Sequence, residues 1–224
     1  MRHIRNALLL LAAMLPLAAL AQAADIPESV KDCASCHQLT QGDDQARYSA
    51  PPLFYAGNKY RQQWLENWLQ EPYRLRPAGG FYADHVVTED GVDAVDENSL
   101  NSHLVLDSET AIEVSEWLMS LTPMNDLLAD SSDYSPGSVS PRLGAMDFVK
   151  FKGCGGCHRD TPEYGGLSGP ELYTAWNRLQ PDYIVSYIKN PRAWNKNSAM
   201  PNRALNDGQI HKLANYLKIL TDED

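Results

Sequence analysis

The stretch Cys154-Gly155-Gly156-Cys157-His158 is the feature around which this 224-residue chain is organised. The same pattern occurs 121 positions earlier, as Cys33-Ala34-Ser35-Cys36-His37. The two motifs contain all 4 cysteines of the sequence, and a histidine follows each pair directly. The fold and the function therefore have to accommodate two well-separated Cys-x-x-Cys-His motifs.

Cys-x-x-Cys-His is the attachment motif of a c-type haem, in which two thiols bond the haem vinyl groups and the adjacent imidazole binds the iron. A thioredoxin-like pair would sit near a βαβ pattern, which neither motif has. A zinc site would combine the thiolates of both pairs, and structural disulfides are a third alternative. The motifs favour two covalent haems, with His37 and His158 as the proximal ligands and these residues as attachment points: Cys33, Cys36, Cys154 and Cys157.

The N-terminus predicts export. Residues 1–23 contain Arg2 and Arg5, an apolar run over residues 7–20, and the Ala21-Gln22-Ala23 sequence of a cleavage site, which together are typical of a signal peptide. The rest of the sequence has no run of 18 apolar residues, so we expect no transmembrane anchor after cleavage. Because bacterial c-type haems are attached outside the cytoplasm, the expected location is the periplasm.

The charge of the chain limits its partners. The formal net charge is -10, and removing residues 1–23 takes away Arg2 and Arg5 and no acid, which leaves -12. Four haem propionates would add further negative charge. Nucleic acid is therefore excluded as a partner, and we expect periplasmic or membrane-bound redox proteins with a basic docking patch. Solubility alone is the other explanation of this charge.

Composition and length predict two domains. A mature chain of this size fits two domains of about 100 residues each. Residues 123–141 are rich in Pro, Gly, Ser and Asp and lack apolar periodicity, which is typical of a linker. The predicted boundaries are therefore residues 25–122 for the first domain, 123–141 for the linker and 142–224 for the second domain.

An internal repeat supports this division. At an offset of 119, Asn58-Lys59 aligns with Asn177-Arg178, and the same register pairs Pro51 with Pro170, Trp64 with Tyr183, Trp68 with Tyr187 and Pro72 with Pro191. At an offset of 99, apolar residues with helical spacing align near the end of each half: Leu106, Ala111, Val114, Leu118 and Leu121 with Leu205, Ile210, Leu213, Leu217 and Leu220. Each half thus ends in an amphipathic helix, and the first half has an insertion at about 77–100.

Each half resembles a class I cytochrome c domain, and the whole chain is similar to periplasmic diheme cytochromes c. Besides the haem motif, the second half has Pro170-Glu171-Leu172, Asn190-Pro191 after an expected helix over 182–190, Met200-Pro201, and Tyr216-Leu217 in the terminal helix. The resemblance implies an all-α fold of two tandem class I domains, each wrapped around one haem. It also implies that a helix over 142–152 crosses the terminal helix at Gly144, against Tyr216.

The resemblance implies the ligands of the second haem. Met200 corresponds to the distal thioether ligand of class I domains, and the carbonyl of Pro170 corresponds to the acceptor of the proximal imidazole proton. A methionine in the polar stretch 197–201 is also a poor core residue. His/Met ligation raises the reduction potential and leaves no open site for a substrate.

The first half departs from this pattern because Asn101-Ser102 stands where the methionine is expected. His103 lies two residues beyond, just before the terminal helix, and is the expected distal ligand. His85, within the insertion, is the alternative, and a methionine or an open site is a third possibility.

Two classes of function follow. In the first, the chain is an electron carrier that passes single electrons between redox partners through a bis-His haem and a His/Met haem. In the second, an open or displaceable sixth position at the first haem makes it a peroxidase-like or sulfur-compound oxidoreductase. A third alternative is the cytochrome subunit of a larger dehydrogenase. The lack of a recognisable substrate motif favours the electron carrier.

Overall fold

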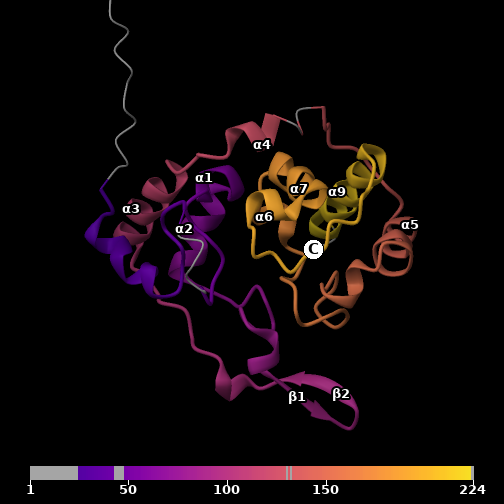
Figure 1. Ribbon diagram of the computed structural model, residues 1–224, viewed down its shortest axis with the longest axis horizontal. Coiled ribbons are helices and arrows are strands. Elements are labelled where there is room, and N and C mark those ends of the chain that lie inside the picture. Colours follow the sequence, from indigo (N-terminus) through magenta and orange to yellow (C-terminus); the bar gives the residue numbers. More distant parts are fainter. Residues whose placement is uncertain (1–24, 43–47, 130, 132, 223–224) are drawn as a thin grey trace, which may run out of the picture.

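The computed structural model describes residues 25–42, 48–129, 131 and 133–222. The predicted signal peptide, residues 1–23, lies outside this part. The described chain forms two helical halves that lie side by side, with a short helix between them (Figure 1). Within the described residues, no helix is long and apolar enough to cross a membrane.

The first half contains a 3-10 helix at Glu28–Ser35, α1 (Ala56–Lys59), α2 (Gln62–Gln70), two short 3-10 turns at Tyr82–Asp84 and Glu97–Ser99, and α3 (Ser108–Met119). The connecting segment carries α4 (Asn125–Ala129). The second half contains α5 (Pro141–Met146) with a π-helical continuation at Asp147–Phe151, a 3-10 turn at Cys154–Gly156, α6 (Ala175–Arg178), α7 (Pro181–Lys189), α8 (Pro191–Trp194) and α9 (Asp207–Asp222).

The terminal helices of the two halves confirm the apolar register. In α3 the side chain of Asp107 caps the helix by accepting a 2.9 Å hydrogen bond from Thr110 N. The predicted stripe then faces the core in both helices, with Val114 and Leu118 of α3, and Ile210 and Leu217 of α9, all buried. The helix expected over 182–190 is α7, and it ends before Pro191 as predicted.

The close crossing of α5 and α9 is also confirmed. A Cβ atom on Gly144 would lie 2.3 Å from Cδ2 of Tyr216, so only glycine lets the two helices approach this closely. The Tyr216 hydroxyl donates a 2.8 Å hydrogen bond to the buried carboxylate of Asp160. The ring of Phe148 packs against Tyr216 at 5.7 Å. This crossing fixes the segment that leads into Cys154.

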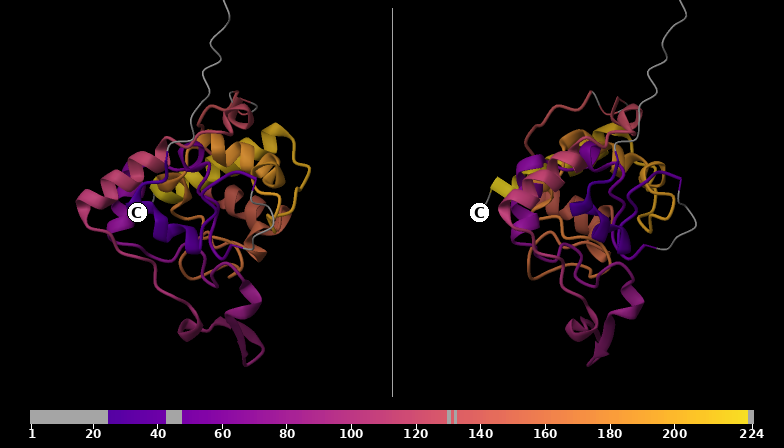
Figure 2. Two further views of the ribbon diagram at one scale, coloured as in Figure 1. Left: turned by 60° about the vertical axis from the view of Figure 1, so that its left-hand side comes forward. Right: turned by 90° about the vertical axis from the view of Figure 1, so that its left-hand side faces the viewer.

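The insertion corrects the all-α expectation, because it contains a two-stranded antiparallel hairpin. Strand β1 (Val86–Glu89) pairs with β2 (Val92–Val95). Asp90 and Gly91 form the turn with φ values of 52° and 79°, as an Asp-Gly hairpin turn requires. The Asp-Gly pair between short valine-containing runs is the sequence signal for this hairpin. The hairpin extends away from both helical halves (Figures 1 and 2).

The two halves meet through equivalent segments of the repeat. Tyr60 forms an antiparallel β-bridge with Leu179, which is its equivalent at the offset of 119. On either side, Arg61 N donates to Arg178 O at 3.0 Å and Gln180 N donates to Lys59 O at 2.9 Å. These two bonds are also equivalents of each other in that register. The halves are therefore related by an approximate two-fold axis, like the subunits of an isologous dimer.

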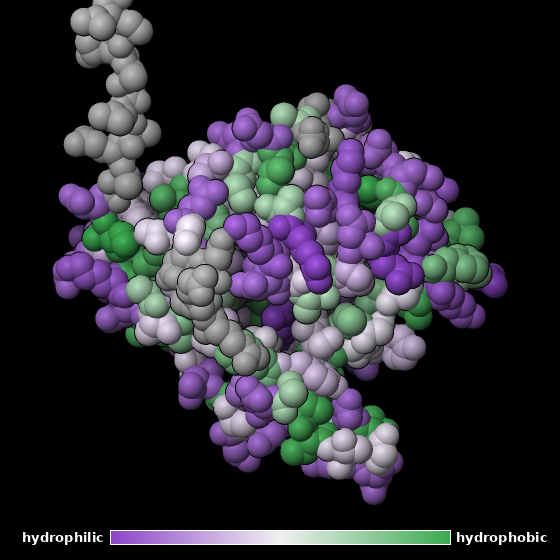
Figure 3. Space-filling model, in the orientation of Figure 1, coloured by the Kyte–Doolittle hydropathy of each residue, from purple (hydrophilic) through white to green (hydrophobic). Residues whose placement is uncertain are grey.

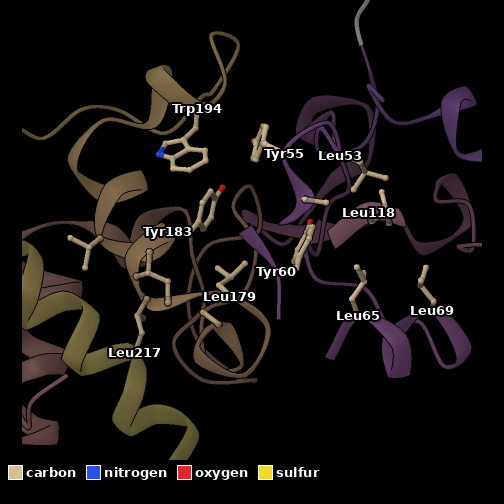
Figure 4. Close-up of a cluster of buried hydrophobic side chains, with 14 of the residues drawn as sticks. Leu53, Tyr55, Tyr60, Leu65, Leu69, Leu118, Leu179, Tyr183, Trp194 and Leu217 are labelled. Atoms are coloured by element: carbon tan, nitrogen blue, oxygen red, sulfur yellow. The ribbon is translucent and has the colours of Figure 1, made fainter. Parts of the chain in front are cut away.

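A continuous core crosses this junction. The rings of Tyr55, Tyr183 and Trp194 lie 4.7–6.3 Å apart and are at most 4% exposed (Figure 4). The predicted linker contributes as well, because Ser186 donates to Leu127 O at 2.7 Å and the buried Tyr134 packs into the same core. Leu127 and Tyr134 of the predicted linker therefore lie against the core, while Met124 and Asn125 bond Asn58 of the first half. On the outside, hydrophilic side chains cover most of the face seen in Figure 3.

Candidate haem sites

The two motifs have the same backbone geometry. His37 N donates to Cys33 O at 2.9 Å, and His158 N donates to Cys154 O at 3.0 Å, so a tight turn places each histidine beside its cysteines. Gly153, with φ of 68°, supplies the left-handed residue that redirects the chain from the π-helical segment into Cys154. The four cysteines form no disulfide with one another, and the second of each pair is exposed. Both turns present two thiols and one imidazole together.

The proximal imidazoles are oriented by equivalent prolines. His37 Nδ1 and His158 Nδ1 each lie 2.7 Å from a carbonyl oxygen, that of Pro51 and that of Pro170 respectively. The expected contact of Pro170 is thus confirmed, and the repeat register accounts for Pro51. A donating Nδ1–H leaves Nε2 as the free nitrogen of the ring, and carbonyl bonds of this kind fix metal-ligating histidines.

The surroundings keep both imidazoles neutral. Desolvation by burial lowers the pKa of His37 to about 4, and it also lowers the pKa of His158. The positive charges of Lys59 and Arg178 act in the same direction, each on the histidine of its own half. These two cations are equivalents in the repeat register. The neutral imidazole is the form that binds a metal.

His103 lies opposite His37. The centroids of the two rings are 6.2 Å apart and the planes are inclined by 70°. His103 Nδ1 bonds Leu104 O at 2.7 Å, which again leaves Nε2 unengaged. Two imidazoles that bind one metal from opposite sides, with bonds of about 2 Å, place their centroids about 6 Å apart. The sequence had pointed to His103, and the structure brings it to this position.

His85 lies elsewhere in the first half. Its Nδ1 is 2.8 Å from the hydroxyl of Ser99, and its ring packs against Gly79 at the base of the hairpin. Among the described residues, the ring contact of His37 is with His103. The two candidate histidines therefore differ in what they contact. His85 contacts residues of the insertion, and His103 contacts His37 of the motif.

The segment that carries Met200 lies against the second motif. Met200 is half-buried, and its backbone N donates to Ser198 Oγ at 3.3 Å, while Ser198 Oγ is 3.0 Å from the Tyr187 hydroxyl. Leu205, farther along, and Cys154 both pack against the cluster of Phe148, Leu213 and Tyr216. Burial raises the pKa of the Cys154 thiol to about 11, and the nearby charge of Arg203 opposes this shift. The loop thus returns to the haem motif.

The donors present fit haem. Each half offers two unpaired thiols and an imidazole with a free Nε2, and Gly169 shows how closely the second site is built. A Cβ atom on Gly169 would lie 2.6 Å from Nδ1 and from Cε1 of His158, so the chain passes directly over the ring. This arrangement holds the imidazole in one orientation, which a proximal iron ligand requires.

Comparison with known families supports this interpretation for the second half. Residues 140–217 match the family model described as cytochrome C oxidase, cbb3-type, subunit III. These residues are thus similar to a cytochrome c domain. The match supports a c-type cytochrome with covalent haem, and hence haem-based electron transfer, and it covers about a third of the chain. No curated protein and no solved structure matches the chain.

One contact near the sites was not predicted. Trp68 packs edge-on against His103, with ring centroids 4.5 Å apart. Its equivalent in the cytochrome c domain is Tyr187, which contacts the Met200 segment through Ser198. The repeat register could have predicted this contact. Trp68 of α2 and Tyr187 of α7 are equivalent, and each contacts the segment that carries the expected distal ligand of its half.

Proposed function

We propose that this protein is a periplasmic diheme cytochrome c that transfers single electrons between redox partners. The first haem is attached at Cys33 and Cys36 with His37 and His103 as axial ligands. The second is attached at Cys154 and Cys157 with His158 and Met200 as axial ligands. The separation of 6.2 Å between the His37 and His103 rings carries the proposal for the first haem.

The ligand sets give the transfer a direction. Haem iron supplies a one-electron couple, and a thioether ligand raises its potential relative to a second imidazole. Electrons therefore pass from the first site to the second. The β-bridge between Tyr60 and Leu179, made by the hydrogen bonds on either side of it, supports a fixed relation between the two sites.

The role of the protein residues in this function is to hold the axial ligands. Pro51 and Pro170 orient the proximal rings through 2.7 Å contacts. Trp68 packs against His103 and would hold its ring in place as a ligand. With two axial ligands at each iron, neither site offers a position for a substrate, which favours a carrier over an oxidoreductase.

Export and charge complete the proposal. Residues 1–23 direct the chain to the periplasm, where its redox partners present a basic patch to the negative surface.

Ligand binding and haem counting test this function. We expect two haems per chain by mass and by the absorbance of the pyridine complex. The reduced protein should bind carbon monoxide slowly at both sites, and the oxidised protein should resist cyanide. One haem per chain would contradict the diheme assignment. Rapid binding at the first haem together with peroxide turnover would favour an oxidoreductase.

A further inference from the structure

A turn of the first half reaches the second haem site. Glu171 N donates to Leu75 O at 2.6 Å, and Ala78 N donates to Leu167 O at 3.2 Å, so residues 75–78 run along the segment that contains Pro170. Gly79 N closes the turn by donating to Arg76 O at 3.0 Å, with Gly79 in the left-handed region at φ 64°. Ala78 is fully buried in this contact. The start of the insertion is therefore built into the other half.

Arg76 stands in this turn beside the second site. Its positive charge acts to lower the pKa of His158, and it opposes the burial that raises the pKa of Tyr187, so Arg76 lies near both residues. Arg76 is exposed at the surface, and the protein around it still lowers the pKa of its guanidinium by partial desolvation. Tyr187 in turn contacts the Met200 segment through Ser198. Arg76 thus lies within electrostatic reach of both His158 and Tyr187.

The neighbouring arginines differ from Arg76 in their pairing. Arg74 forms an ion pair with Glu97, and Arg178 lies 3.5 Å from a carboxylate oxygen of Glu171. Within the described residues, Arg76 has no carboxylate partner. Because Arg76 is exposed and has no ion pair among these residues, its guanidinium is available to a negatively charged group.

We propose that Arg76 binds a propionate of the second haem, so that the insertion of the first half completes the haem site of the second. The inference rests on the proposed attachment of that haem at Cys154 and Cys157. A guanidinium and a carboxylate form paired, charge-assisted hydrogen bonds, which matches the chemistry of a propionate. The insertion then couples the two halves through the cofactor as well as through Leu75 and Ala78.

The charge of Arg76 should affect the iron. A positive charge favours the ferrous over the ferric state, so its removal lowers the reduction potential of the nearby haem. If a unit charge lies roughly 10 Å from the iron in an effective dielectric near 20, its removal changes the ferric-to-ferrous ratio at a fixed potential by about tenfold. A tenfold change corresponds to about 59 mV for a one-electron couple.

Redox titration of the complete diheme protein tests the inference. Arg76→Gln should lower the potential of the His/Met haem by about this amount and leave the bis-His haem unchanged. Arg74→Gln removes the same charge from an exposed ion pair two residues away and should move neither potential. Equal shifts in the two variants, or a shift at the first haem, would overturn the inference. A potential of the second haem that depends on added phosphate would also overturn it, because Arg76 would then bind a free anion instead of a propionate.

Arg76→Lys keeps the test decisive if the glutamine variant does not fold. Lysine retains the charge and loses the paired hydrogen bonds. The ferric-to-ferrous ratio of the second haem at a fixed potential should therefore change by less than about threefold. The propionate bands in the resonance Raman spectrum should shift. Unchanged propionate bands would overturn the inference. Failure of the proposed function would instead appear in the unmodified protein, as the absence of a His/Met redox step.

Discussion

Substitution of Gly169 tests the construction of the second haem site. A Cβ atom there would lie 2.6 Å from two ring atoms of His158 and 2.8 Å from Cys157 O, whereas ordinary contacts begin at 3.4 Å. The Cys157 carbonyl is held by a 2.7 Å bond from Gly169 N, so the imidazole has to move, by almost 1 Å. The bond between His158 Nδ1 and Pro170 O, now 2.7 Å, would then exceed the limit of about 3.2 Å for a good hydrogen bond.

We expect Gly169→Ala to lower the free energy of unfolding by about 2–4 kcal/mol, of which about 1–3 comes from overpacking and about 1 from the lost hydrogen bond. The assay is urea unfolding of the diheme protein, followed by the absorbance of the haems. Gly156→Ala is the matched control, because nothing lies within 4 Å of a Cβ atom at that position of the same motif. Equal stability of the two variants would refute the reasoning.

Three further outcomes are expected. Gly144→Ala should destabilise the protein by about 1–3 kcal/mol in the same assay, because a Cβ atom would meet the Tyr216 ring at 2.3 Å, whereas Gly208→Ala, with its nearest neighbour at 3.5 Å, should not. Trp68→Leu removes the ring 4.5 Å from His103 and should speed carbon monoxide binding at the first haem by stopped flow; an unchanged rate would show that Trp68 does not hold the ligand. Burial raises the pKa of Tyr183 well above 10, so the folded state retains a proton that the unfolded state loses, and stability should fall as pH rises above about 10 and fall less steeply in Tyr183→Phe.

The local parts of the sites could be predicted from the sequence. The spacing within Cys154–His158 fixes a turn, and the repeat register places Pro51 and Pro170 under equivalent histidines. The apolar stripe of α9 and the glycine at the α5 crossing follow from short-range patterns, because helix periodicity and steric access are local properties. These features can therefore be predicted from the sequence without knowing how the two halves pack together.

The remaining features depend on contacts between distant segments. The sequence predicted a linker between two domains. It did not predict that the halves pair through Tyr60 and Leu179, because no periodicity of either segment indicates that pairing. Arg76 lies at the edge of an insertion, and its position beside His158 follows only from the docking of residues 75–78. The sequence also could not decide whether His103 or His85 is the distal ligand of the first haem, because that depends on which of their two loops packs near His37.

The axial ligands of the first haem are tested most directly by low-temperature EPR with near-infrared magnetic circular dichroism of the oxidised protein. The proposal predicts one His/Met and one bis-His low-spin haem, with His103→Ala converting the bis-His haem to high spin. His85→Ala, which removes a ring held by Ser99, should leave both spectra unchanged. A high-spin haem in the unmodified protein, or loss of the bis-His signal in His85→Ala instead, would contradict the account.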